Sequence, residues 1–366
     1  MKILPVILVG FMLAGSIFTS CKKDPVSPKP CDTCTKPCDT CNINQDSLTH
    51  IRDSVAHAFV WAEYINKIPG ETNPTGVWLF SPNDIMICGN SLWHFDGTSF
   101  QMIDAIRNGS NTSLNFALNG CSIFAFSQTD FWLVDGGSAL HTTDGHHFDD
   151  FRPGSDNACW GTSSNNIFFV GNGGSIYHFN GSRFDTMTSN TVKDLRSVWG
   201  TSSSDVWACG YNTSTGETIL THYDGQSWQE DNLSLTKGIN ATGGFNGVWA
   251  FDSAGHHFVA TSGGILAHKM DNGGWKSDSG LIPNKESDGS FIGIGPRGGT
   301  TTDYFVIGPW GFVAHWNGKT WKQYTTLFDY SNNDYYSSGF SMLGNTACVI
   351  GVKNGQCWVA VGTRKP

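Results

Sequence analysis

A short motif that recurs six times places the strongest constraint on the fold of this chain. It reads His, one or two residues, Asp or Asn, Gly, two residues, and then Phe or Trp. Its histidines are about 44 residues apart on average, within the roughly 40–50 residues that a four-stranded propeller blade occupies. The copies span residues 94–100, 141–148, 178–184, 222–228, 268–275 and 315–321, and the fifth is the loosest.

A second motif lies upstream of each copy and consists of an apolar-aromatic pair, a polar turn and another apolar run. In the clearest copy, Val198-Trp199 leads through Asp205 to the run 206–210. Apolar runs of four or five residues predict strands that are buried on both faces. The Asp-Gly or Asn-Gly pair supplies the positive φ angles of a tight hairpin. Each repeat therefore predicts four strands, A to D, with the histidine motif forming the C–D hairpin.

The number of hairpins predicts how the ring of repeats closes. There are seven A–B hairpins but six complete C–D hairpins, and the last repeat has its third strand near 356–361. We expect residues 57–65 to supply its outer strand. The predicted fold is all-β: a seven-bladed β-propeller of four-stranded antiparallel blades, closed by an N-terminal strand that completes the last blade. A short helix over 46–61, or a helix followed by a strand, is the competing interpretation.

The repeat resembles that of bacterial secreted propeller proteins with the pattern Val-Trp-Gly, Asp-Val-Trp-Ala-Val-Gly, His-Tyr-Asp-Gly and Trp. The resemblance covers about residues 74–363, and its best copy is 197–228. The C–D turn is also similar to the Asp-box hairpin of sialidase-like propellers, although Asp and Gly are usually adjacent here. Kelch and WD40 proteins share the implied architecture, but their diagnostic dipeptides are not found in register.

The N-terminus predicts an exported and anchored chain. Lys2 precedes the apolar run 3–18, which is too short to be a good membrane span. The tetrapeptide Phe18-Thr19-Ser20-Cys21 resembles the lipobox of bacterial lipoproteins, with Phe where Leu is usual. The resemblance implies a signal peptide over 1–20 and lipidation at Cys21, and the charged 22–24 resembles the start of surface-directed lipoproteins. We expect an outer-membrane lipoprotein of the cell envelope that is exposed at the surface; ordinary secretion is the alternative.

Residues 21–47 predict a Cys- and Pro-rich tether that leads to a propeller over 48–366. Its prolines, with Lys, Asp, Ser and Thr, favour an extended spacer. Its cysteines lie too close together for a zinc ribbon, and disulfides are the usual fate of thiols outside the cytosol. Disulfides are therefore favoured over a metal site or free thiols for Cys31, Cys34, Cys38 and Cys41.

The composition and motifs indicate binding more than catalysis. The net charge of −9 argues against a nucleic-acid partner. The repeated histidines occupy equivalent blade positions, so we expect each to bond within its own blade rather than share a metal. We expect the other cysteines to be small buried residues. A disulfide between Cys348 and Cys357 is the alternative. We expect no metal and no cofactor, because no nucleophile, paired-carboxylate or phosphate-loop motif is found.

The long D–A connections, rich in Asn, Ser, Thr, Gly and Tyr, are where we expect recognition to occur. The predicted function is a non-catalytic binding module for a glycan or a protein. A carbohydrate-active enzyme, either a hydrolase or a glycosyltransferase, and a structural subunit of an envelope complex are the alternatives. The candidate ligand-binding residues are Trp310, Tyr330, Tyr335, Tyr336, Tyr211, Arg107 and Arg152.

Overall fold

The structure is a computed structural model. It describes residues 57–110, 112–154, 156–231, 245–250, 257–261, 266–269, 275–277, 297–300, 303–308, 311–324 and 335–365. The predicted signal peptide, lipidation site and tether lie outside these ranges. Within them, none of the helical segments has the length and hydrophobicity needed to cross a membrane.

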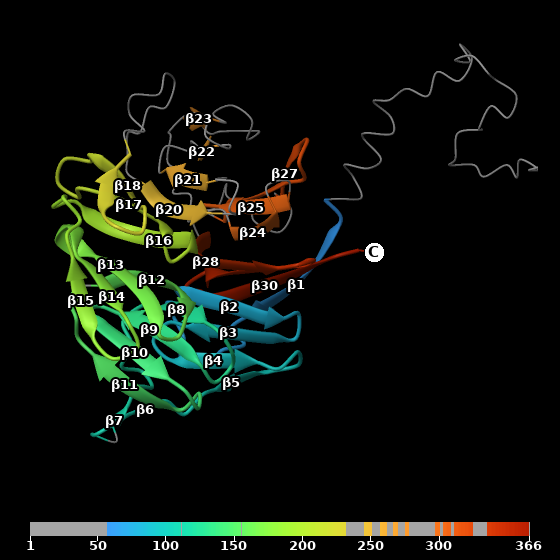
Figure 1. The fold of residues 1–366 in the computed structure, drawn as a ribbon. Coiled ribbons are helices and arrows are strands. Elements are labelled where there is room, and N and C mark those ends of the chain that lie inside the picture. The colour runs from blue at the N-terminus through green and yellow to red at the C-terminus, as the bar shows by residue number, and fades with distance from the viewer. Residues whose placement is uncertain are drawn as a thin grey trace, which may run out of the picture. The chain divides into compact units, whose positions relative to one another are not determined.

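The described residues form an all-β propeller with mainly antiparallel, four-stranded blades (Figure 1). The first three sheets in chain order contain β2 (Gly76–Ser81), β3 (Asp84–Cys88), β4 (Leu92–Phe95) and β5 (Phe100–Met102); β6 (Ile106–Arg107), β7 (Thr112–Ser113), β8 (Ser122–Ala125), β9 (Phe131–Asp135), β10 (Ser138–Thr142) and β11 (His147–Phe151); and β12 (Asp156–Ser163), β13 (Asn166–Gly171), β14 (Ile176–Phe179) and β15 (Phe184–Met187). A short 3-10 helix, η1 (Asn172–Gly174), joins β13 to β14.

The remaining sheets repeat the four-stranded pattern. They contain β16 (Asp194–Ser202), β17 (Asp205–Tyr211), β18 (Thr218–Tyr223) and β19 (Trp228–Glu230); β20 (Phe245–Ala250), β21 (His257–Thr261), β22 (Leu266–Lys269) and β23 (Trp275–Ser277); β24 (Arg297–Thr300), β25 (Asp303–Ile307), β26 (Val313–Trp316) and β27 (Trp321–Gln323); and β28 (Tyr335–Leu343), β29 (Thr346–Lys353), β30 (Gln356–Arg364) and β1 (Phe59–Ile65).

One sheet departs from the prediction of four strands in every blade. Its order is β7-β6-β11-β10-β9-β8, so it has six strands. After β5, the chain runs along the outer edge of β11, where β6 pairs in parallel with it through His147↔Ile106 and Phe148↔Arg107. The backbone N–H groups of Ile106 and Asn108 donate to the carbonyls of His146 and Phe148. The connection thus covers backbone groups that an outer strand otherwise exposes.

Strand β1 pairs antiparallel with β30 along its whole length, from Phe59↔Arg364 to Ile65↔Trp358. Residues 59–61 are therefore in a strand, and the helix interpretation over 46–61 does not hold for them. Figure 1 shows the C-terminus beside the start of β1. In this way the two ends of the described chain lie next to each other in the β28–β30 sheet.

The tight turns between the third and fourth strands follow from the Asp-Gly and Asn-Gly pairs. In the first turn, Asp96 Oδ1 accepts the backbone N–H groups of Thr98 and Ser99 at 2.9 and 2.8 Å. These bonds hold the pKa of Asp96 well below its usual value. The predicted positive φ is confirmed, at +83° to +92°, for Gly97, Gly145, Gly181, Gly225 and Gly318.

The prediction that the cysteines outside the tether are small buried residues is wrong for Cys88 and Cys121 and confirmed for Cys348 and Cys357, which do not form the alternative disulfide. Cys88 and Cys121 form a disulfide between β3 and the start of β8 instead of acting as small apolar residues. Cys348 and Cys357 are both free and buried. Cys348 faces Val361 and Cys357 faces Val352, so the register of β29 and β30 separates the two thiols along the strands.

Candidate functional site

The repeated histidines bond within their own blades, as predicted, in each of the five copies whose side chains the structure describes. The imidazole reaches the residue that starts the second strand or, for His141, the residue just before it. His94 Nε2 lies 2.8 Å from Asp84 Oδ1, and His222 Nε2 lies 2.8 Å from Asp205 Oδ1. The other three pairs are His141 with Asp130, His178 with Asn166, and His315 with Asp303.

Cross-strand register explains why a histidine and an aromatic residue recur together. His222 lies opposite Trp207, and their rings stack with centroids 4.2 Å apart. Trp132 and His141 stack at the same distance. The aromatic residue fixes the plane of the imidazole while the Asp fixes its Nε2 atom. We therefore interpret the repeated histidine as a structural group.

A repeated β-bulge shapes the innermost strands. In four of these strands one residue is skipped by the pairing register close to the start of the strand. A bulge leaves its extra residue unpaired and re-aims its side chain. The skipped residues are Asn157 in β12, Arg196 in β16, Asn246 in β20 and Ser338 in β28.

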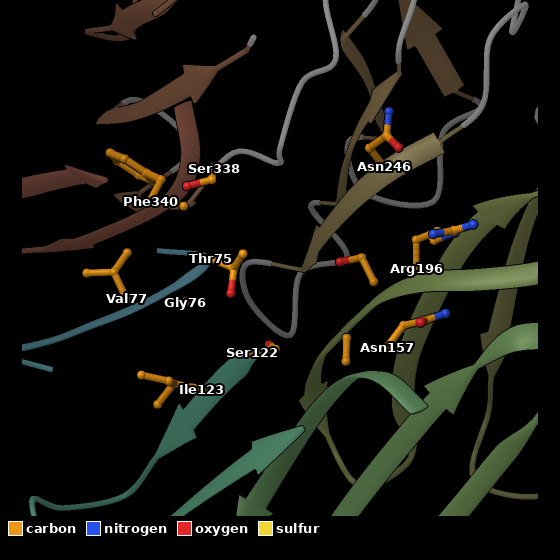
Figure 2. A pocket seen from close by; sticks show the side chains of 13 residues that line it. Thr75, Gly76, Val77, Ser122, Ile123, Asn157, Arg196, Asn246, Ser338 and Phe340 are labelled. Carbon is orange, nitrogen blue, oxygen red and sulfur yellow. The ribbon is translucent and has the colours of Figure 1, made fainter. Parts of the chain in front are cut away.

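All four bulge residues line one cavity of about 140 Å³ that the innermost strands surround (Figure 2). Thr75 and Ser122 add two further hydroxyl groups to this lining. Several of these groups also tie neighbouring inner strands together. Thr75 Oγ1 donates to the carbonyl of Cys121 at 2.9 Å, and Asn157 Nδ2 donates to the carbonyl of Leu195 at 2.8 Å.

Aromatic side chains fill the same central space further along the inner strands. Trp78 of β2 and Phe124 of β8 have ring centroids 5.0 Å apart, and Phe124 lies 6.0 Å from Trp199 of β16. Strand β12 separates β8 from β16, because it contacts both. The Phe124 and Trp199 rings therefore meet within the space that the inner strands enclose, beyond the polar end of that space.

Arg196 is the only residue with a charged side chain among the described residues that line the cavity. Figure 2 shows its guanidinium turned away from the centre of the cavity. Arg196 Cζ lies 5.2 Å from the centroid of the Tyr211 ring, and Nη2 lies 3.3 Å from Asp194 Oδ2. Its Nε is buried and has no hydrogen-bond partner among the residues that the structure describes. The guanidinium is thus held in place at the rim of the cavity, while one of its N–H groups makes no hydrogen bond to the described residues.

Comparisons with known proteins agree with this architecture. The solved structure of YCF48 bound to D1 peptide has a TM-score of 0.60 at 16% identity, covering 84% of this chain and 95% of that one. YCF48 from Cyanidioschyzon merolae has a TM-score of 0.60 at 13% identity, covering 81% and 98%. Raptor from Chaetomium thermophilum has a TM-score of 0.58 at 9% identity, covering 88% of this chain but 30% of that one.

These neighbours share the propeller fold with this chain. At such low identities, the likeness shows the fold alone. No family model matches the sequence, and a search of curated proteins also finds no match.

The predicted ligand-binding residues separate into groups. Tyr211 lies under Arg196, next to the cavity rim. Arg107 and Arg152 lie on a different sheet, where both pair with Asp150 at 3.1 and 3.2 Å. Tyr335 and Tyr336 belong to β28, three and two residues before the bulge at Ser338. Trp310 and Tyr330 lie outside the described residues.

Sequence reasoning missed the bulge residues. Their pattern was nevertheless present, because each precedes a small residue, an apolar residue and, in three of four copies, Trp. Asn157, Arg196 and Asn246 stand three residues before Trp160, Trp199 and Trp249, and Ser338 stands three before Ser341. Aligning the copies on that Trp would have placed these polar side chains at one level of the ring.

Proposed function

We propose that this chain is a surface-anchored, non-catalytic β-propeller lipoprotein that binds a polypeptide at the polar end of its central cavity. The observation that carries the proposal is the repeated bulge, which directs hydroxyl, amide and guanidinium groups from four separate sheets to one place. Such groups match the peptide groups and polar side chains of a polypeptide. A neighbouring fold solved with a bound peptide supports this class of ligand.

We further propose that the seven sheets close into one ring and that β1 latches it. Apolar clusters support this closure, because each links neighbouring sheets. One joins Trp249 of β20 to Tyr304 of β25, and another joins Phe305 of β25 to Trp358 of β30. A third joins Ile350 of β29 to the first sheet, the one that contains β2. A closed ring would hold the bulge residues at fixed positions around the cavity.

The start of β1 lies at the end of the last sheet that is opposite the polar end of the cavity. In the last sheet, Ser337 at the cavity end is in register with Gly351, Trp358 and Ile65. The opposite end of the same sheet contains the start of β1, where Phe59 faces Arg364. The residues through which the proposed anchor would join the propeller are thus remote from the proposed binding site.

The same face has an exposed aromatic side chain that suits polypeptide binding. Phe116 is 62% exposed and has a φ of +59°, a conformation that bulky residues rarely adopt. Its backbone N–H donates to Ser91 Oγ at 2.8 Å, and its ring lies over Gly70. Backbone strain of this kind persists where surrounding contacts hold it, often at binding sites. Phe116 is therefore a second candidate contact for the partner.

Selection from a phage-displayed library of random peptides on the immobilised propeller tests the proposal. We expect enriched peptides whose binding falls at least about tenfold in Arg196→Ala, because a charge-assisted hydrogen bond contributes about 1.5–3 kcal/mol. The matched control is Arg183→Ala. Arg183 also pairs with an Asp two residues away, Asp185, at 2.8 Å, but it lies in the turn before β15, at the far end of its blade.

Four outcomes would contradict the proposal. Equal loss in both arginine variants would show that the cavity rim is not the site. Binding confined to a glycan array would favour the carbohydrate alternative, and turnover of an arrayed glycan would favour the enzyme. If neither library binds, while crosslinking in cells recovers one envelope complex that survives the Arg196→Ala change, the chain would be a structural subunit.

A further inference from the structure

A buried row of polar side chains lies where both ends of the described chain meet the β24–β27 sheet. His57, just before β1, and His315, on β26, are 4% and 0% exposed. Their Nδ1 atoms lie 2.7 Å apart. His57 Nε2 lies 3.1 Å from Thr320 Oγ1, and His315 Nε2 lies 2.7 Å from Asp303 Oδ1. The other repeat histidines described above reach the corresponding Asp or Asn, whereas this one also meets a second imidazole.

When both rings are neutral, the donors and acceptors in this row determine which nitrogen of each imidazole carries the proton. Asp303 accepts from the Arg364 guanidinium and from His315 Nε2–H. A neutral imidazole has one donor and one acceptor nitrogen, so His315 Nδ1 must accept from His57 Nδ1–H. His57 Nε2 then accepts from the Thr320 hydroxyl. Every polar group in the row has a partner in this state.

The closed row can accept one proton but not two. A single proton on His315 is tolerated if His57 shifts its own proton from Nδ1 to Nε2, toward Thr320. A second proton would set two N–H groups against each other at the 2.7 Å contact, with no acceptor between them. Two separated, exposed histidines have no such restriction and each takes up its proton near pH 6.5.

Burial opposes protonation of His315 further. It lowers the pKa of His315 more than any other effect, and the pKa is lowered overall. Asp303 raises this pKa through its hydrogen bond and its charge, whereas Arg364 at the end of β30 and Lys322 on β27 lower it by smaller amounts. Tyr324, next to β27, donates its hydroxyl to the carbonyl of His57 at 2.9 Å and so places that ring beside the others.

We propose that His57, His315, Asp303 and Arg364 form an acid-sensitive latch that holds β1 and the end of β30 against the β24–β27 sheet. The direction in which pH changes the opening equilibrium follows from proton linkage. Above about pH 6.5 both imidazoles are neutral in the closed and open states, and the latch is fully formed. As the pH falls below that value, the open state binds protons that the closed state excludes, so opening becomes more favourable.

Hydrogen exchange of the full chain, corrected for intrinsic exchange rates, measures the opening of β1. Between about pH 7.5 and 5.5, excluding one proton raises the opening equilibrium about tenfold, and excluding two raises it about a hundredfold. We therefore expect the protection of amides in β1 to fall by about tenfold or more. Protection in β17 and β18 should change by much less.

The variant His57→Gln tests the mechanism, because an amide can either donate to His315 Nδ1 or accept from it. We expect it to keep β1 in place and to reduce the change in protection to less than about threefold. His222→Gln is the matched control, since His222 has the same repeat position but faces Asp205 and Trp207 of its own blade. It should leave the pH response of β1 unchanged.

The proposal fails if protection in β1 falls no more than protection in β17 and β18. It also fails if His57→Gln retains the tenfold response of the natural chain. Should His57→Gln not fold, His315→Gln provides the same test, because its amide can still donate to Asp303 and pair with His57. None of these readouts depends on whether the cavity binds a polypeptide, so the two proposals can fail separately.

Discussion

Replacing Trp358 with Ala should lower the free energy of unfolding by about 3–5 kcal/mol, the usual cost of removing a large buried aromatic side chain. Trp358 is 0% exposed and packs with Phe305, Phe340 and Val349 between two sheets. Its Nε1 also donates to Glu63 Oε2 of β1 at 3.0 Å. The substitution therefore leaves both a cavity and a carboxylate with one donor fewer. Denaturant unfolding followed by circular dichroism measures the loss.

Two further variants test whether the loss comes from the buried contact of Trp358. Trp358→Phe retains most of the packing and loses the indole N–H, so we expect an intermediate loss of about 1–3 kcal/mol. Val192→Ala removes a side chain that is 81% exposed and should change stability by less than about 0.5 kcal/mol. If Trp358→Ala is no more destabilised than Val192→Ala, then the contact between β1, β30 and the β24–β27 sheet does not stabilise the propeller.

The repeated blades were predictable because each depends on residues close together in the sequence. The apolar run 206–210 and the pair Asp224-Gly225 are sufficient to specify a buried strand and a tight hairpin. The pairing of residues 57–65 followed from counting hairpins rather than from any local pattern. The structure pairs residues 59–65 with β30. A sheet that lacks its outer strand leaves unpaired backbone groups, which another segment must cover.

The cavity was not predictable in the same way. A bulge shifts the register by one residue, and an alternating pattern does not show which residue is skipped. Arg196 reads as an ordinary strand residue until its pairing with β17 is known. The pairing of Arg107 and Arg152 with Asp150 also depends on the parallel strand β6, which has no repeat counterpart. These features arise from contacts between segments, so local patterns do not indicate them.

Removing the Cys88–Cys121 disulfide should cost about 3–4 kcal/mol, because it closes a loop of 33 residues in the unfolded chain. This bond was missed because the cysteines outside the tether were interpreted as small buried residues. The bond joins adjacent sheets, one through β3 and the other at the start of β8, so the double variant Cys88→Ala/Cys121→Ala should loosen their contact. Denaturant unfolding of this variant should match that of the natural chain under reducing conditions.

A matched substitution separates the crosslink from simple loss of sulfur. Cys209 is buried and free, so Cys209→Ala removes a thiol without opening a loop. The substitution should cost about 1 kcal/mol, and this cost should be the same with and without reductant. Alkylation of Cys88 in the natural chain before reduction would contradict the prediction, as would an unfolding midpoint that reductant leaves unchanged. Full oxidation on export would also support the proposed envelope location, since stable disulfides form mainly outside the cytosol.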